Sequence, residues 1–483
     1  MLAALNAAEP RAEAEYERGM AAARLGRWEE ARAALREARR LAPRDARFPI
    51  ELGGVAFRQK RYDEAAGWLR RGLRLAPEDG YTADFLGTIY YLQGNLEAAL
   101  KYWNRISKPR IAAVRVEPEP RLDPVLLDRA LAFAPGEMLP VSGLLAARAR
   151  VRGLGVFPVF RFHLDAREDG SFDASLHGRE RDRWGGGALA ALVSVLRGAA
   201  YQTVYPEYFN IGRSAINVES LVRWDAQKRR AWAALSGPLG HDPRFGYRLG
   251  LDLRDEQWEI PGGGAPHLRR GALSGEVVGF AGRWKWSAGV ELARRDSSGA
   301  SYQLKHLGRV ERTLWHVPEH RFETAAGFSS ALARRFKRFQ AGLATRWLPR
   351  MSGEDWAIAH RVRAGKICGD APFDEWFALG LERDNDLWMR AHIGTRGGRK
   401  GNAPMGRTYA LSNWEMDKNV YTHALLAVKL SPFVDAGRMA GTSKWLCDAG
   451  VQAKLRVPGA SFTLTYGKDL RSGRNAFYLM ATR

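Results

Sequence analysis

Residues 245–254, with the sequence FGYRLGLDLR, alternate large apolar side chains with glycine or charged residues. The odd-numbered residues from Phe245 to Leu253 fall on one face of an extended chain, and the residues between them fall on the other. Residues 284–292, WKWSAGVEL, repeat the pattern. A period of two predicts β-strands that have one apolar face and one polar face.

Alternation of this kind recurs from about residue 184 to Arg483, for example over residues 451–457 and 461–466. A soluble sandwich would also alternate, because its apolar face packs on a second sheet. About 300 residues of long strands with short turns divide into about 16 strands of membrane-spanning length. The length therefore favours a C-terminal transmembrane antiparallel β-barrel over residues 184–483.

The charge distribution narrows the classes of partner. The chain has 75 Lys+Arg and 53 Asp+Glu residues, a formal net charge of +22. The basic residues of the second part are interspersed along alternating segments, which fits a wet lumen or a lipopolysaccharide-facing rim better than a nucleic-acid-binding stripe. No nucleic-acid partner is expected. No run approaches the ~18 consecutive apolar residues that a membrane-spanning helix needs, so none is predicted.

The N-terminal part repeats with a period of 34 residues, the interval from Gly19 to Gly53 and from Gly53 to Gly87. The other recurring positions are Ala31, Ala65 and Ala99, Leu41 and Leu75, and Pro43 and Pro77. Small residues at fixed positions let paired helices approach closely, and the pattern resembles tetratricopeptide repeats. Residues 12–108 are therefore predicted to form three helical hairpins. Their concave groove either binds a peptide or protein, or the array is a spacer.

Residues 1–11 precede these repeats and contain a short apolar stretch with small residues. They lack a basic segment and a full hydrophobic core, so a signal-peptide remnant and an ordinary N-terminal tail both remain open.

Residues 110–182 change period twice. Residues 111–115 alternate as a strand, Asp123–Phe133 and Leu139–Leu154 have helical patterns, and residues 156–166 and 172–179 again alternate around a Glu-Asp-Gly turn. This βααββ order, with Pro-Gly-Glu at 135–137 and Gly-Val-Phe at 155–157, resembles a POTRA (polypeptide-transport-associated) domain. The resemblance implies that partner chains are bound by extension of a sheet edge within residues 155–179.

A POTRA-like segment followed by a barrel-like one resembles the BamA-type, or bacterial surface antigen, superfamily. Members carry Val-Arg-Gly-aromatic on an extracellular loop that folds into the lumen. Here residues 387–392, LWMRAH, keep the arginine as Arg390, with Ala391 and His392 in the next two places. The partner motif, aromatic-x-Asp-x-Gly, matches residues 432–437, PFVDAG, with Asp435. Residues 448–451 and 464–470 also resemble the family's last strands.

The resemblance implies that Arg390 and Asp435 pair and anchor the loop, since guanidinium and carboxylate form directed charge-assisted bonds. The room left after Arg390 places the loop between about the eleventh and twelfth strands, and Asp435 near the end of the thirteenth. The alternative is that Arg390 is a solvated surface charge and Asp435 a turn former. The chain also lacks the C-terminal aromatic residue usual in such barrels, which leaves its assembly route open.

No catalytic motif is present: there is no Gly-x-Ser-x-Gly, Walker loop or His-Glu-x-x-His sequence. Glu207, Asp370, Asp374 and Glu375 are carboxylates that an acid/base pair would need, but charged lumen residues are the ordinary interpretation. We therefore expect no enzyme, no cofactor and no metal site.

The two cysteines are assigned to opposite rims of the predicted barrel. Strand counting places Cys368 in a periplasmic turn between the tenth and eleventh strands, and Cys447 just after the extracellular loop that follows the thirteenth. The distance between the rims then excludes a disulfide between them.

The favoured interpretation is an outer-membrane assembly or translocation factor with periplasmic N-terminal domains. It would capture client outer-membrane or secreted polypeptides and insert or export them, with accessory proteins and outer-membrane lipid as further partners. Client strands would enter between the first strand and residues 475–483. The alternatives are a channel or pore for polysaccharide or another solute, and a soluble basic scaffold.

Overall fold

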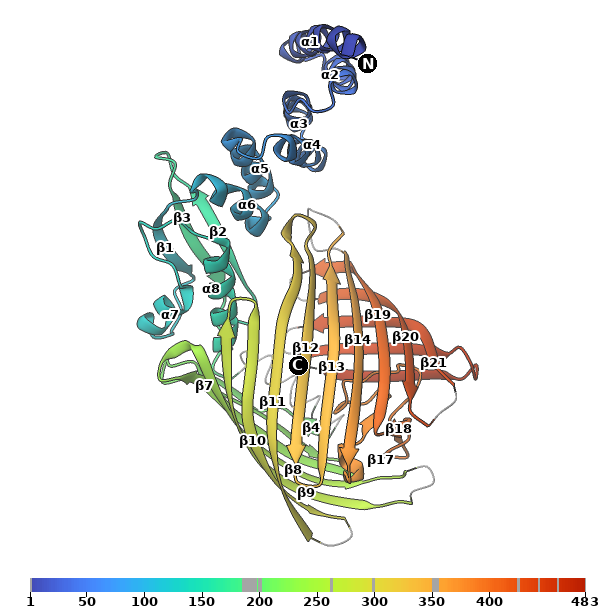
Figure 1. Cartoon of the computed structure of the whole chain (residues 1–483). Coiled ribbons are helices and arrows are strands. Elements are labelled where there is room, and N and C mark those ends of the chain that lie inside the picture. Colours follow the sequence, from blue (N-terminus) through green and yellow to red (C-terminus); the bar gives the residue numbers. More distant parts are fainter. Residues whose placement is uncertain are drawn as a thin grey trace. The chain divides into compact units, whose positions relative to one another are not determined.

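The computed structural model describes residues 2–184, 198, 202–260, 264–297, 300–349, 356–423, 426–441, 444–457 and 460–482. The chain divides into two compact units. The first contains residues 1–115, 133–144 and 162–176, and the second contains residues 116–132, 145–161 and 177–483. Figure 1 shows the helices at the N-terminal end and the large sheet that follows.

The N-terminal helices pair as hairpins. They are α1 (Leu2–Arg24), α2 (Trp28–Leu41), α3 (Arg47–Arg58), α4 (Tyr62–Leu75), α5 (Gly80–Leu92) and α6 (Leu96–Trp103). The repeated small residues lie where the helices meet. A Cβ atom on Gly53 would lie 2.6 Å from Cγ of Leu69, and one on Gly87 would lie 2.2 Å from Cδ1 of Trp103. The 34-residue period is therefore a packing requirement. None of the described helices combines the length and hydrophobicity needed to span a bilayer.

The next segment has the predicted βααββ order. After the 3₁₀ turn Asn104–Ile106, its elements are β1 (Ile111–Glu117), α7 (Pro124–Leu131), α8 (Val141–Leu154), β2 (Phe160–Ala166) and β3 (Phe172–Gly178). Asp123 caps α7, since its side chain accepts a bond from the N–H of Val125. The sheet order β1-β3-β2 makes β1 and β2 its edge strands.

Sixteen of the described strands after β3 form one large sheet, in agreement with the predicted number. Its strands are β4 (Thr203–Val204), β5 (Glu207–Ile211), β6 (Ile216–Trp224), β7 (Lys228–Leu239), β8 (Asp242–Gln257), β9 (His267–Ala281), β10 (Trp284–Asp296), β11 (Ala300–Val317), β12 (Phe322–Ala333), β13 (Phe336–Trp347), β14 (Trp356–Gly369), β19 (Thr408–His423), β20 (Leu426–Met439), β21 (Leu446–Val457), β22 (Ala460–Asp469) and β23 (Asn475–Thr482). Neighbouring strands pair antiparallel, and a short 3₁₀ turn, Pro318–His320, joins β11 to β12.

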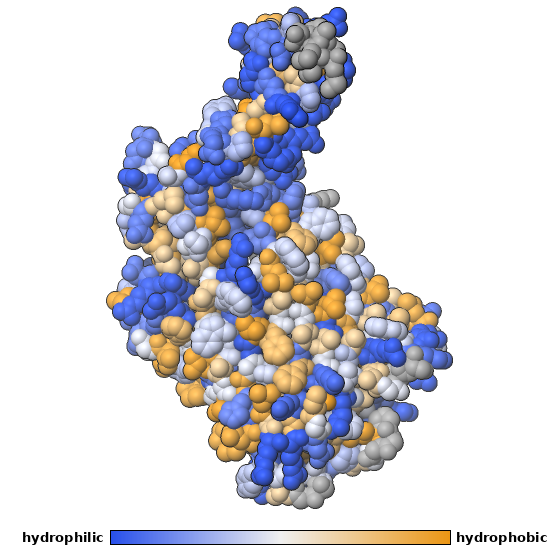
Figure 2. All heavy atoms as spheres, in the orientation of Figure 1, coloured by the Kyte–Doolittle hydropathy of each residue, from blue (hydrophilic) through white to orange (hydrophobic). Residues whose placement is uncertain are grey.

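The two faces of this sheet differ in polarity. Leu251, Leu273, Leu292 and Leu304 are paired in register across β8–β11 and are 39%, 60%, 52% and 50% exposed. On the opposite face of β9 and β10, Ala272 and Ala293 are only 5% and 0% exposed. The sheet thus exposes leucine on its outer face, and Figure 2 shows hydrophobic residues spread over the sheet surface that it presents.

A long loop, residues 370–407, joins β14 to β19, which are the eleventh and twelfth described strands of the sheet. The loop contains the 3₁₀ turn Phe373–Glu375 and four two-residue strands, β15 (Phe377–Ala378), β16 (Thr395–Arg396), β17 (Arg399–Lys400) and β18 (Met405–Gly406). Its position between the eleventh and twelfth strands is the predicted one. Asp435 lies on the thirteenth strand, β20, four residues before the last residue, Met439.

The prediction for Cys368 is wrong. Cys368 is the second-last residue of the eleventh strand, β14, at the edge of the sheet where the long loop begins. Cys447 is the second residue of β21 and follows the turn after the thirteenth strand, as predicted. Because β14 ends and β21 begins at the same edge, the two thiols share one rim rather than lying on opposite rims. Both cysteines are free.

Candidate functional site

The candidate site is the loop of residues 370–407 together with the inner face of the large sheet. Leu379, Leu387 and Met389 of the loop are at most 2% exposed. They belong to one apolar cluster with Tyr409 of β19 and Met439 of β20, among other residues. This packing seats the middle of the loop on the inner face, because apolar side chains are stabilised by leaving water.

Arg390 and Asp435, which the sequence predicted as partners, form an ion pair through two bonds. Nη2 of Arg390 lies 2.7 Å from Oδ1 of Asp435, and Nε lies 2.9 Å from Oδ2. The backbone N–H of Arg390 also donates to Oδ2 at 3.1 Å. The side chains are 2% and 0% exposed. Arg390 is thus one of the most deeply buried large residues of the chain, and the solvated-charge alternative does not describe it.

Further groups complete the polar shell around the Arg390 guanidinium. Nη1 donates to Oε2 of Glu415 at 2.6 Å and to Oε1 of Gln452 at 3.0 Å. The guanidinium carbon lies 3.8 Å from the centre of the Phe433 ring. The sequence interpretation missed Glu415 and Gln452. Alternation along β19 and β21 places both residues on the inner face, but only the three-dimensional structure shows that both bind the Arg390 guanidinium.

The two residues after Arg390, Ala391 and His392, share a partner of their own, Asp448. The backbone N–H of Ala391 donates to Oδ2 of Asp448 at 2.7 Å, and Nδ1 of His392 lies 3.1 Å from the same oxygen. Burial disfavours the charged imidazolium, but the bond to Asp448 outweighs burial and raises the pKa of His392. Gly467 of β22 makes room for this turn, since a Cβ there would lie 2.8 Å from the carbonyl oxygen of Arg390.

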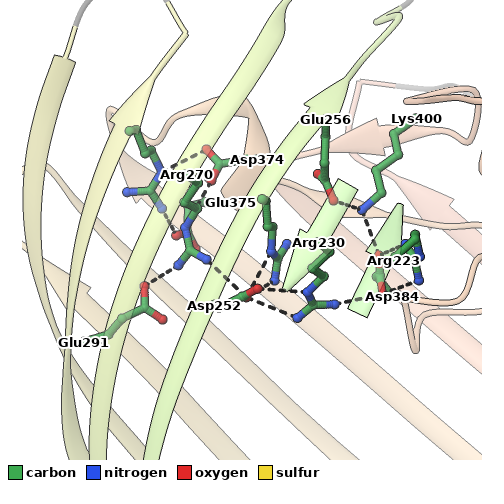
Figure 3. Close-up of polar contacts among 12 residues, drawn as sticks. Arg223, Arg230, Asp252, Glu256, Arg270, Glu291, Asp374, Glu375, Asp384 and Lys400 are labelled. Carbon is green, nitrogen blue, oxygen red and sulfur yellow. Dashed lines mark hydrogen bonds and ion pairs between the residues drawn. The ribbon is translucent and has the colours of Figure 1, made fainter. Parts of the chain in front are cut away.

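A second ion cluster ties the loop to the beginning of the sheet (Figure 3). Asp384 of the loop accepts bonds from Arg223 of β6 at 2.9 Å, from Arg230 of β7 at 2.8 Å and from Lys400 of the loop at 3.0 Å. Lys400 also donates to Glu256 of β8 at 2.7 Å. Burial favours the neutral form of Asp384, but the surrounding cations hold its pKa well below the ordinary value.

A third ion cluster joins the loop to the next strands of the sheet, β10 and β11, and Figure 3 also shows it. Asp374 of the loop pairs with Arg295 of β10 at 2.8 Å, and Glu375 pairs with Lys305 of β11 at 2.7 Å and with Arg295. Burial raises the pKa of Glu375, but Lys305 and Arg295 outweigh this effect and lower it to about 2. Glu375 is therefore an anion at neutral pH and holds no proton for acid catalysis.

The other two carboxylates that the sequence singled out lie apart from these clusters. Glu207 is on β5, with Arg181 at 3.9 Å. Asp370 follows β14, and its backbone N–H donates to the carbonyl of Arg335. Within the described residues, no group of three or more His, Cys, Asp or Glu side chains is arranged to hold a metal ion.

The contacts of the loop require the sheet to curl around it. Arg223 on β6 and Asp435 on β20 are separated by the strands β7–β14 and β19 in the ladder. At about 4.8 Å per strand, ten spacings span about 48 Å on a flat sheet. Their loop partners, Asp384 and Arg390, are separated by at most about 21 Å of extended chain. The inner face therefore lines a lumen that the loop occupies.

Comparisons with known proteins describe what the chain resembles. A family model described as Tetratricopeptide repeat matches residues 16–80. No curated protein sequence matches the chain. Among solved structures, the crystal structure of BamA from Haemophilus ducreyi lacking POTRA domains 1–3 is similar at 11% identity and a TM-score of 0.45, covering 77% of this chain and 84% of that one. CdiB from Escherichia coli is similar at 12% identity and a TM-score of 0.49, covering 78% and 75%.

Proposed function

We propose that this chain is an outer-membrane β-barrel protein that engages client polypeptides in the periplasm and inserts them into, or exports them across, the outer membrane. The observation that carries the proposal is the inverted polarity of the large sheet. Its outer face exposes leucine, and its inner face buries arginine, lysine and carboxylates against a loop. This polarity suits a sheet surrounded by hydrocarbon with a polar interior.

The outer face argues against the soluble alternatives. The outer face is apolar on later strands as well as along the leucine row. There Phe328, Leu343 and Val362 are 45%, 44% and 41% exposed, and Leu343 pairs in register with Val362. Water-soluble proteins rarely leave contiguous apolar surface of such extent uncovered. A second sheet would cover it in a sandwich, whereas lipid covers it in a barrel.

We assign the orientation in the membrane from the edge of the large sheet that the start of α7 and the end of α8 contact. The carbonyl of Leu154 in α8 accepts a bond from Asn217 of β6, and the N–H of Asp123 donates to the carbonyl of Arg213. These contacts lie at the edge opposite to the long loop. With the N-terminal domains in the periplasm, the edge that carries residues 370–407 and both cysteines faces the cell exterior.

Two features support engagement of polypeptides. The strand β2 is an edge of its three-stranded sheet, and an edge strand offers backbone N–H and C=O groups to an incoming chain. Arrays of helical repeats generally present a concave surface of the kind that binds peptides. The loop fills part of the lumen through three ion clusters, so transport requires either displacement of the loop or entry beside it, at the two ends of the strand order, β4 and β23.

Membrane insertion is tested by expression in a Gram-negative host. The full chain is expected in the outer-membrane fraction, resistant to alkaline extraction, and its gel mobility should change on heating as it does for closed barrels. Recovery in the soluble fraction would refute the barrel and every step built on it.

Client engagement is tested with a photoreactive amino acid at Arg161, an exposed residue of β2. Crosslinks to nascent outer-membrane or secreted polypeptides are expected there. The matched control position is Asp128, which is exposed on α7 and lies on no strand edge. Equal crosslinking at both positions, or none at Arg161 in an inserted protein, would contradict capture by this edge.

A further inference from the structure

The outer surface of the large sheet carries a hollow of about 550 Å³ near the edge where the long loop begins. Its lining includes Arg229 of β7, Arg269 of β9 and Arg294 of β10. All three are exposed, and alternation places them on the outer face, opposite to the inward Arg230, Arg270 and Arg295 of the ion clusters. Arg223, Arg230, Arg254 and Arg270 also contribute to the lining, but their side chains pair with carboxylates on the inner face. The hollow is therefore described here by its outward-facing residues.

The outward arginines differ from the inward ones in their partners. Arg230 and Arg295 bind carboxylates at 2.8 Å. In the described part of the chain, no carboxylate pairs with Arg229 or Arg294, and Arg294 instead lies over the Tyr302 ring at 5.8 Å. Arg269 has one distant partner, Asp255, at 3.6 Å. Two guanidiniums thus retain their capacity to bind an anion.

The shape of the hollow follows from small residues between these arginines. Register pairing places Ala231, Leu253, Gly271 and Arg294 in one row across β7–β10. Gly271 offers no side chain, and a Cβ atom added there would meet only the end of Leu253, at 3.4 Å. The next row on the outer face, two residues along each strand, is the exposed leucine row. The hollow therefore lies about 7 Å beyond the apolar surface.

We propose that this hollow, called here the rim site and defined by Arg229, Arg269, Arg294, Ala231 and Gly271, binds the phosphate group of a membrane lipid. The inference rests on the proposed function, because it needs the leucine row to lie in hydrocarbon. A lipid whose acyl chains cover the leucines brings its phosphorylated headgroup to the level of the arginines. Free phosphate lacks these apolar contacts, so a lipid is the favoured source.

The carboxylates of the rim site limit the class of ligand. Asp255 and Asp296 also line the hollow, so its outward-facing residues, three arginines and two aspartates, have a net charge of 3 − 2 = +1. Nε2 of His267 lies 2.5 Å from Asp255, and Arg269 engages the same carboxylate. The two remaining guanidiniums are then placed to bind phosphate by charge-assisted bonds.

The test is native mass spectrometry of the full chain, folded in detergent and titrated with the bisphosphorylated glycolipid lipid A. Folding is verified first by heat-modifiable gel mobility, whose absence would refute the barrel itself and the rim site with it. Wild type is expected to retain lipid A. The double variant Arg229→Gln with Arg294→Gln should lose at least about tenfold in apparent affinity, because each substitution removes charge-assisted bonds. Gly271→Val, which fills the hollow and keeps every charge, should also weaken binding.

The control is Arg312→Gln. Arg312 of β11 lies over the Trp284 ring at 4.6 Å, so it repeats the arrangement of Arg294 and Tyr302 on the same two strands at the opposite edge. This variant should bind lipid A as wild type does. Unchanged binding by the double variant, or an equal loss in Arg312→Gln, would overturn the rim site. Full competition by inorganic phosphate would show a soluble-anion site and overturn the assignment to lipid.

Discussion

Arg390 and Asp435 lie 45 residues apart in the chain and join through two side-chain bonds, of 2.7 and 2.9 Å, in a setting where both are almost completely buried. Removal of one member of a buried pair leaves the other charge without its partner, which typically destabilises by about 3–5 kcal/mol. The loss of stability should affect the attachment of the loop rather than the sheet, because the strands are held together by backbone hydrogen bonds.

Arg390→Ala should free the loop while the sheet stays folded. The guanidinium also holds Glu415 and Gln452, so this variant is expected to be more severe than Asp435→Ala, and the double variant should be no worse than Arg390→Ala alone. The measurement is limited proteolysis within residues 370–407 of the inserted protein. Arg309→Ala, which changes an exposed arginine of β11, is the control. Additive defects would show that the two residues act independently.

Asp384→Asn should release the other side of the loop. The substitution leaves Arg223, Arg230 and Lys400 close together without their shared carboxylate, and we expect a loss of about 3–5 kcal/mol in loop attachment. Arg223→Gln in the same background removes one uncompensated charge and should restore part of the thermal unfolding midpoint. Failure of the second substitution to restore anything would mean that charge balance is not what holds this cluster.

The strands of the sheet could be predicted from the sequence, whereas the ion cluster around Asp384 could not. Alternation and turns are local signals, so β8 and β10 were recognisable from a few residues each. The bond between Arg223 and Asp384 joins positions 161 residues apart, and no local pattern contains it. Arg390 and Asp435 were predicted only through a family motif that the chain keeps at the two charged positions.

The error over Cys368 also has a physical origin. The prediction placed Cys368 before the eleventh strand and Arg390 after it, so it expected a membrane-spanning strand between these two residues. In the structure this segment belongs to the long loop and contains the 3₁₀ turn Phe373–Glu375 and the two-residue strand β15. A spanning strand carries the chain from one edge of the sheet to the other, so the extra expected strand put Cys368 at the wrong edge.

Two contacts of the loop should weaken at opposite ends of the pH range, that of His392 as pH rises and that of Glu375 as pH falls. The pKa of His392 is raised, so its stabilising contact with Asp448 is complete below the ordinary value near 6.5 and is lost as pH rises through the raised value. The pKa of Glu375 is lowered to about 2, so its contribution is complete above the ordinary value near 4.5 and is lost as pH falls toward 2.

Protease sensitivity of the loop, measured by brief exposure after incubation at each pH, should be lowest between these two limits. His392→Gln should abolish the change on the alkaline side only, and Glu375→Gln should abolish the change on the acid side only. A variant that altered both windows would show that the two contacts are not separate.

The cysteines give the sharpest test of strand direction. Since β14 ends and β21 begins at the same edge, both thiols are predicted at the outer rim, where an impermeant maleimide reaches them in intact cells. Cys368 is exposed and Cys447 is partly buried, so Cys368 should react faster. The strands β19 and β20 separate them, and three spacings of about 4.8 Å give about 14 Å, beyond the ~7 Å between Cα atoms that a disulfide tolerates. No intramolecular disulfide is expected.

The control is Arg312→Cys in a background without the native thiols. This variant should react only after permeabilisation, because residue 312 lies near the opposite edge. Protection of Cys368 in intact cells, together with labelling of Cys447, would contradict the direction assigned to β14.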